Sequence, residues 1–335
     1  MNKIKITKLP KSEVEIEGEL AVEIFESFYR RSLEKLGANL EIPGFRKGKA
    51  PENVLAANLG EMKILEEMAG MALAEYYPKI LEENNIDAIG QPAITITKLA
   101  RQNPLGFKIR TAVLPEVKLP DYKKIAKKIK AEITDREKDT SVSDEELEKT
   151  IEDIRKSRTP KDSEPLALDD AFVKSLGPFE NVEDFKKKLR ENIKLEKENQ
   201  ARERTRLKIM EAVIKDSVIE LPEILVELEL DKIIYRMESD ITNMGLKFED
   251  YLKQLNKKVE DLRKELRPDA EKKAKLGLIL GAIAKAEKLA AEQEAVAKEV
   301  AHILEHYKDA DPERARIHAE NVLTNEKVFQ FLESQ

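Results

Sequence analysis

The first 115 residues mix two hydrophobic periodicities, one typical of helices and one typical of strands. Apolar residues at every third or fourth position predict an amphipathic helix from Val22 to about Gly37, and a second helix over residues 61–85. Because strand-like segments flank these helices, the region predicts a compact α+β domain. Strict alternation of apolar and polar residues predicts its four strands, at residues 4–6, 14–16, 94–96 and 107–113.

The pattern changes after residue 115. Residues 116–165 are rich in charge and typical of a linker. Within them, DYKKIAKKIKAEIT predicts a single strand, and Ser143 followed by Glu146 forms a capping box that predicts the start of a helix. From residue 166 onward the periodicity is almost wholly helical. Its most apolar segment, LGLILGAIA, predicts a central buried helix in which Gly277 and Gly281 allow a neighbouring helix to approach closely.

The composition narrows the possible classes of protein. Charged residues make up 38% and aromatic residues 5% of the 335 residues, which favours long solvated helices over one compact enzyme body. The chain has no cysteine, which excludes disulfides, thiolate metal sites and cysteine nucleophiles. The N-terminal residues lack the apolar core of a secretory signal, and the longest apolar run is shorter than the roughly 20 residues that cross a bilayer. We therefore expect a cytoplasmic protein with no membrane partner.

The segment IPGFRKGKAP, at residues 42–51, is the strongest candidate for a binding site. Its two glycines permit a turn that other residues resist, and no acidic residue lies among its three cations. An exposed aromatic side chain beside cations is typical of a binding hot spot for an anionic, partly apolar surface such as a ribonucleoprotein. The alternative is a solvated loop whose Phe45 folds back onto its own domain. The candidate residues are Gly44, Phe45, Arg46, Lys47, Gly48, Lys49 and Pro51.

A second candidate is an apolar stripe at helical spacing in the C-terminal half. Such a stripe is typical of the core between two helices. It could equally form a partly exposed surface for unfolded polypeptides, because flexible methionine side chains adapt to many sequences. The candidate client-binding residues are Val226, Leu230, Ile233, Met237, Ile241 and Met244.

Signals for catalysis are sparse. His302, Glu305 and His306 match the H-x-x-E-H pattern of some zinc peptidases, but the only other histidine is His318 and no third ligand stands out. We therefore expect at most an incidental affinity for divalent metals, and we assign no metal site, cofactor or catalytic residue. The sequence contains no phosphate-binding glycine loop, G-x-S-x-G elbow or dinucleotide fingerprint.

The candidate loop is similar to the ribosome-docking signature of the trigger factor family, bacterial chaperones that wait at the exit tunnel for nascent chains. The segment GFRKGKAP matches that signature. The resemblance implies that Phe45, Arg46 and Lys47 contact protein and rRNA at the tunnel rim of the large ribosomal subunit. Three further segments resemble the entry to the family's helical domain, an arm helix and the central helix: LDDAFVKSLGPFENVEDFKKKLRENI, IELPEILVELELDKIIYRM and LRPDAEKKAKLGLILGAIAKAEKL.

The resemblance also implies an overall α+β organisation and a function. A ribosome-binding α+β domain would span residues 1–115, a linker strand and helix residues 116–165, and an elongated all-α chaperone domain with helical arms residues 166–335. The implied function is that of an ATP-independent chaperone that shields nascent polypeptides during folding. The same resemblance leaves open a homodimer off the ribosome.

One departure from the family pattern changes the expected activity. Trigger factors normally carry an FKBP-like peptidyl-prolyl isomerase domain between the linker and the helical domain, and this chain has no room for it. The only aromatic residues of the stretch 134–216 are Phe172, Phe179 and Phe185, too few for an aromatic-walled proline pocket. We predict that the chain is not an enzyme. The alternatives are an isomerase by family inheritance and a free cytoplasmic holdase without ribosome binding.

Overall fold

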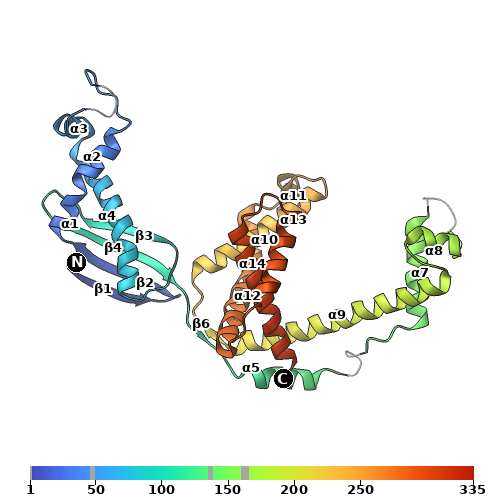
Figure 1. Ribbon diagram of the computed structural model, residues 1–335. Helices are drawn as coiled ribbons and strands as arrows, with labels where there is room; N and C mark the ends of the chain where they lie inside the picture. Colours follow the sequence, from blue (N-terminus) through green and yellow to red (C-terminus); the bar gives the residue numbers. More distant parts are fainter. Residues whose placement is uncertain (1, 46–49, 135–138, 160–165) are drawn as a thin grey trace. The chain divides into compact units, whose positions relative to one another are not determined.

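The computed structural model describes residues 2–45, 50–134, 139–159 and 166–335 (Figure 1). The chain divides into two compact units, each built from two separate parts of the sequence. The first unit contains Met1–Lys118 and Val218–Gly277, and the second contains Leu119–Ser217 and Leu278–Gln335.

The first unit begins with an antiparallel sheet in the order β1-β2-β4-β3, covered by helices on one face (Figure 1). Its elements are β1 (Asn2–Leu9), β2 (Glu13–Leu20), α1 (Val22–Ser27), α2 (Tyr29–Gly37), α3 (Glu52–Leu59), α4 (Glu61–Glu83), β3 (Ala88–Lys98), β4 (Leu105–Val113) and β5 (Val117–Lys118). The four predicted strands and the helix over 61–85 are thereby confirmed, and so is the α+β class. The predicted helix from Val22 is interrupted at Phe28, whose buried ring separates α1 from α2.

Strand register explains why one face of this sheet is a core. Ile16 on β2 pairs with Ile109 on β4, and Ile6 and Ile94 pair with them from the two edge strands, so four isoleucines form one row. The central pair is fully buried. The opposite face carries charges that pair across strands, including Glu15 with Lys108 at 3.2 Å. Alternation of apolar and charged residues therefore fixes which face the helices cover.

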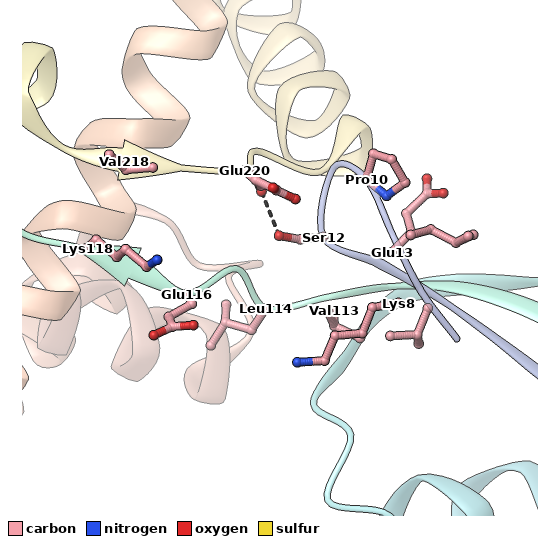
Figure 2. Close-up of a pocket in the computed structure, with 12 residues that line it drawn as sticks. Lys8, Pro10, Ser12, Glu13, Val113, Leu114, Glu116, Lys118, Val218 and Glu220 are labelled. Carbon is pink, nitrogen blue, oxygen red and sulfur yellow. Dashed lines mark hydrogen bonds between the residues drawn. The ribbon is translucent and has the colours of Figure 1, made fainter. Parts of the chain in front are cut away.

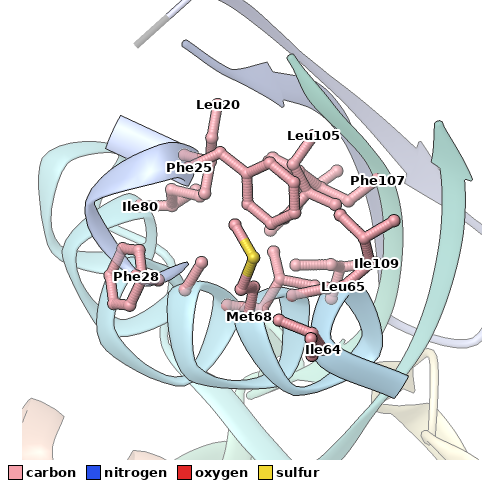
Figure 3. Close-up of a cluster of buried hydrophobic side chains, with 14 of the residues drawn as sticks. Leu20, Phe25, Phe28, Ile64, Leu65, Met68, Ile80, Leu105, Phe107 and Ile109 are labelled. Atoms are coloured by element: carbon pink, nitrogen blue, oxygen red, sulfur yellow. The ribbon is translucent and has the colours of Figure 1, made fainter. Parts of the chain in front are cut away.

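Helix α4 supplies the other half of this core. Figure 3 shows Ile64, Leu65 and Met68 of α4 directed toward Phe107 and Ile109 of the sheet. Met68 is completely buried, and Ile64 and Leu65 are exposed by less than 5%. Burying side chains of this size stabilises by about 1.5–3 kcal/mol each, so this packing gives the small domain its own stability.

The first unit continues with a helical part. It comprises β6 (Val218–Ile219), α10 (Glu223–Asn243), α11 (Phe248–Gln254) and the beginning of α12 (Val259–Glu287). Val226 and Leu230 of α10 pack with Ala270 of α12 in a small core. Beside it, Arg263 and Arg267 of α12 bond to carboxylates on α10, and these partners raise the pKa of both guanidinium groups. Charge pairs and a short apolar contact together align the two helices.

The glycines of α12 do not have the predicted role. Gly277 and Gly281 are exposed, and a Cβ atom added at either would have no neighbour within 4 Å. The large buried residues of this part of α12 are Ile279, Leu280 and Ile283. Ala274 and Ala284, near the glycines along the helix, are buried as well. With open space beside both glycines, they do not mark a close helix crossing.

The second unit is entirely helical in the described residues. It contains α5 (Tyr122–Glu132), α7 (Asp144–Arg158), α8 (Asp170–Leu176), α9 (Val182–Asp216), the end of α12, α13 (Gln293–His306) and α14 (Pro312–Glu333). The Ser143 cap is confirmed, because its side chain accepts a hydrogen bond from the backbone N–H of Glu146 at 3.1 Å. Helices α7, α8 and the start of α9 share a small core that includes Ile151, Phe172 and Phe185.

The prediction of a strand over DYKKIAKKIKAEIT is wrong, because this segment forms α5. Tyr122, Ile125 and Ile129 are spaced three and four residues apart and form the half-buried stripe of a helix, with the buried Ala126 between them. Asp121 caps the helix by accepting from the N–H of Lys124. Burial and the Glu287 carboxylate, which accepts a hydrogen bond from the Tyr122 hydroxyl at 2.6 Å, raise the pKa of Tyr122 to about 12.

A single buried arginine joins α9 to α14. The side chain of Arg206 is only 10% exposed, and it donates to Glu333 at 2.6 Å and to Glu326 at 2.8 Å. Its guanidinium also lies 5.1 Å from the ring centroid of Phe329. On the N-terminal side of Arg206, the next buried residue of α9 is Phe185, so the intervening turns of this helix are exposed or half-buried.

We predict that Arg206→Ala lowers the free energy of unfolding by about 2–3 kcal/mol, because it removes the charged donor that two partly buried carboxylates share. The measurement is urea unfolding followed by circular dichroism. Arg204, two residues away on α9, is exposed, so Arg204→Ala is the matched control and should change stability by less than about 0.5 kcal/mol.

The same interaction should depend on pH. The Arg206 guanidinium lowers the pKa of Glu326, so its stabilising effect is complete above the ordinary glutamate range and is lost as the pH falls through the lowered pKa. The gap between wild type and Arg206→Ala should therefore shrink toward about pH 3. If the difference in unfolding free energy between the two proteins is the same at neutral pH and at low pH, the ion-pair interpretation is wrong.

Candidate binding surfaces

The candidate loop is held at both of its ends by the core of the α+β domain. Leu40 and Ile42 on the incoming side and Ala50 on the outgoing side pack against that core. At its start, Gly37 lies so close to Leu55 of α3 that an added Cβ would come within 2.8 Å of the leucine side chain. These contacts fix where the loop leaves and re-enters the domain.

The described part of the loop directs Phe45 outward. Gly44 has a φ of 88°, which glycine adopts without strain, and the N–H of Phe45 bonds to the carbonyl of Ile42 at 3.1 Å. Phe45 is 43% exposed and does not belong to the buried core or to the partly buried residues around it. The alternative in which Phe45 folds back onto its own domain is therefore not the arrangement of the described residues.

The remaining loop residues divide into two groups. Pro51 is the N-cap of α3, where its carbonyl accepts hydrogen bonds from the N–H groups of Val54 and Leu55. The predicted contacts Arg46, Lys47, Gly48 and Lys49 lie outside the described residues.

The apolar stripe on α10 is buried at some of its positions and accessible at others. Val226 and Leu230 are exposed by 3% and 1%, so the core with α12 accounts for them. Met244, at the other end, is 77% exposed. Ile241 is also buried, at 7%, so the accessible members of the stripe are Ile233, Met237 and Met244. This narrows the prediction of a continuous six-residue client surface.

These accessible residues line a groove of about 650 Å³ between α10, α11 and α12. Ile233, Met237, Ile241 and Met244 contribute its apolar part, Tyr251 adds an aromatic ring from α11, and Lys273 adds a cation from α12. The sequence analysis missed Tyr251 and Lys273. No periodic pattern links residues on three different helices, so the sequence contained no signal for them.

A second hollow lies where the β1–β2 turn meets the β5–β6 ribbon (Figure 2). The hydroxyl of Ser12 donates to the carbonyl of Glu220 at 2.7 Å, which leaves it tied to the backbone. Leu114 and Val218 are more than half exposed at the rim, and both positively charged lysines and negatively charged glutamates surround them. The residues that line this hollow include no nucleophile paired with a base.

The two histidines of the H-x-x-E-H segment lie on the exposed side of α13, with ring centroids 4.4 Å apart. Across the described residues, no group of three or more His, Cys, Asp or Glu side chains could hold a metal ion. Likewise, none of the described helices is both long enough and apolar enough to span a membrane.

The described surfaces suit the binding of other macromolecules: an α+β domain with a projecting aromatic loop, followed by paired helices with an apolar groove. The chain belongs to the trigger factor family. The family model for bacterial trigger factor protein matches residues 2–154, and the family model for the C-terminus of that protein matches residues 181–332.

Curated relatives named trigger factor match over nearly the whole chain. The protein from Clostridium botulinum strain Hall is 24% identical over 415 aligned positions, covering 97% of this chain and 94% of the relative. Those from Carboxydothermus hydrogenoformans and Pelotomaculum thermopropionicum are 27% and 25% identical, covering 95% and 94% of this chain and 95% and 90% of the relatives. The alignments are longer than the 335 residues of this chain, so these relatives carry residues that it lacks.

A solved structure shares the fold. It comes from work on promiscuous substrate recognition in the folding and assembly activities of the trigger factor chaperone. The TM-score is 0.60 at 18% sequence identity, over 99% of each chain.

The division of the α10 stripe predicts two different mutational outcomes. Leu230→Ala should lower the free energy of unfolding by about 2–5 kcal/mol, because it opens a cavity in the contact with α12. Met244→Ala should change it by less than about 0.5 kcal/mol, because the methionine is exposed. Urea unfolding of both variants provides the comparison. Equal losses would mean that the two ends of the stripe are buried alike.

Proposed function

We propose that this chain is an ATP-independent chaperone of the cytoplasm that docks at the exit tunnel of the large ribosomal subunit and shields nascent polypeptides. The observation that carries the proposal is Phe45, held 43% exposed at a loop whose two ends are packed against the domain core. Exposing an aromatic ring is unfavourable unless a partner covers it. The cations that follow it in the sequence favour a partner rich in phosphate.

The proposed ribosome contact combines two kinds of interaction. Phe45 would insert into an apolar pocket of ribosomal protein, while Arg46 and Lys47 would pair with phosphates of rRNA at the tunnel rim. An aromatic anchor beside cations suits such a mixed surface, because the ring contributes affinity and the charges contribute rapid, salt-dependent association.

We further propose a division of labour along the chain. Residues 1–115 would bind the ribosome, residues 116–165 would link the halves, and residues 166–335 would form the chaperone domain. Only the family resemblance supports a homodimer off the ribosome, which belongs to the same proposal.

The groove between α10, α11 and α12 is the proposed client surface. Its apolar part includes two methionines, whose unbranched side chains adapt to different client sequences, and Met244 is freely accessible. Each contact would be weak. Tethering at the tunnel raises the effective concentration of the emerging chain, so weak contacts suffice. Release then requires no nucleotide, because a client that buries its own apolar surface leaves the groove.

We propose that isomerase activity is absent. Residues 159–169 connect α7 to α8. The backbone N–H of Leu166 donates a hydrogen bond to the Thr159 hydroxyl, and its carbonyl accepts one from the Arg155 side chain. This short connection supports the view that no isomerase domain lies between the linker and the helical domain.

The ribosome contact can be tested by replacing Phe45, Arg46 and Lys47 together with alanine. Loss of the aromatic anchor removes about 2 kcal/mol or more, and every 1.4 kcal/mol is a factor of ten, so affinity for ribosomes should fall by at least about tenfold. Wild-type binding should also weaken as salt rises. Co-sedimentation with purified ribosomes at several salt concentrations measures both effects.

The matched control removes the same kinds of side chain elsewhere in the domain. Ile6, Lys5 and Lys8 are exposed on the edge strand β1, and threonine at all three preserves the strand preference. This variant should sediment with ribosomes as wild type does. If the loop variant sediments with ribosomes as well as wild type does, the loop is not the tether. If wild type itself fails to sediment with ribosomes, the chain is a free holdase.

The chaperone activity can be separated from isomerase activity in solution. Wild type should suppress aggregation of an unfolded client without ribosomes. Met237→Glu with Met244→Glu should weaken that protection, because an apolar segment that covers a carboxylate must remove water from the charge. Neither protein should accelerate a proline-limited refolding step. Acceleration that an FKBP-pocket ligand abolishes would instead establish the inherited isomerase activity.

A further inference from the structure

The exposed end of α13 carries a side-chain pair that the proposed chaperone function does not use. His302 and His306 are one helical turn apart, both are exposed, and their ring centroids are 4.4 Å apart. The third histidine, His318, lies on α14 and is also exposed. Two accessible imidazoles on one helix face are the arrangement by which helical histidine pairs bind transition metals.

The tautomer of one ring is set by the backbone. Nδ1 of His306 lies 3.0 Å from the carbonyl oxygen of His302. A carbonyl can only accept, so Nδ1 carries the proton and donates it. The neutral ring therefore has its lone pair on Nε2, the atom that a metal would bind, and the hydrogen bond fixes the orientation of the ring.

The separation of the rings suits two ligands on one ion. Metal–nitrogen bonds of about 2.0–2.1 Å place two neighbouring ligand nitrogens roughly 3 Å apart. Rings with centroids 4.4 Å apart can reach that spacing if His302 rotates about its side-chain bonds while the hydrogen bond holds His306.

The position on the helix also favours a cation. Helix α13 ends at His306, so the pair lies on its last turn, where the carbonyl groups carry the negative end of the helix dipole. The N–H of Tyr307 closes this turn through a bond of 2.8 Å to the carbonyl of Ile303. A bound ion would join two successive turns at the point where helices usually fray.

We propose that His302 and His306 form a two-histidine site for a transition-metal dication such as Zn²⁺, Ni²⁺ or Cu²⁺. The histidines provide two ligands through imidazole nitrogen, and water completes the coordination, because no third protein ligand accompanies them in the part of the chain that the structure describes. Imidazole selects these ions over Mg²⁺ and Ca²⁺, which prefer oxygen. The site binds metal without catalysing hydrolysis.

Isothermal titration calorimetry of the full chain with Ni²⁺ and Zn²⁺ tests the site. Wild type should bind one equivalent, and His302→Gln or His306→Gln should weaken binding by about tenfold or more, because either change removes the chelate. His318→Gln is the matched control and should leave the affinity unchanged. Mg²⁺ should produce no binding heat at this site.

A second measurement reports where the ion binds. Zn²⁺ should slow amide hydrogen exchange at Tyr307 in wild type and in His318→Gln, but not in His302→Gln/His306→Gln. Circular dichroism confirms that every variant keeps its helix content. Undiminished one-to-one binding in the double variant, or equal weakening by His318→Gln, would overturn the proposal. Neither outcome depends on ribosome or client binding.

Discussion

A scarcity of large apolar side chains is the constraint on which this structure depends. Only 5% of the residues are aromatic, while 38% are charged, so the chain cannot surround all of its helices with one continuous core. It forms separate small cores instead, such as those around Met68 and Ile151. Ion pairs add to these cores where neighbouring helices meet. Arg206, Arg263 and Arg267 hold pairs of helices together through their carboxylate partners, at positions where a protein with more apolar residues would use leucines.

This division has a direct effect on what remains accessible. A helix that is buried along one short contact keeps its other apolar residues in solvent. On α10, Leu230 is enclosed while Met244 is open, although both belong to the same sequence pattern. The proposed client surface is therefore the part of an ordinary helix stripe for which the chain has no internal partner. Phe45 is likewise an apolar side chain that stays accessible to solvent, in a loop instead of a helix.

Much of the fold was predictable from local pattern. Alternation located the four strands because apolar residues recur at every second position, and in the central strands β2 and β4 this pattern separates a buried face from a charged one. The Ser143 cap was visible because a capping box is a contact between near neighbours. Helix α5 was mistaken for a strand although the spacing of Tyr122, Ile125 and Ile129 is helical. The division of the α10 stripe, and the contributions of Tyr251 and Lys273, could not be predicted. They depend on where α12 ends its contact with α10, which no local pattern records.

The long exposed stretch of α9 makes the family's architecture modular. Its 35 residues span about 52 Å at 1.5 Å per residue, and the small core shared with α7 and α8 lies at the opposite end from Arg206. An insertion between α7 and α8 would meet only that small core, so natural selection could add or delete a whole domain there without repacking α14 against α9. An insertion or deletion at this point therefore disturbs few packing contacts. A lineage can gain or lose an enzymatic domain there while it keeps the same helical domain.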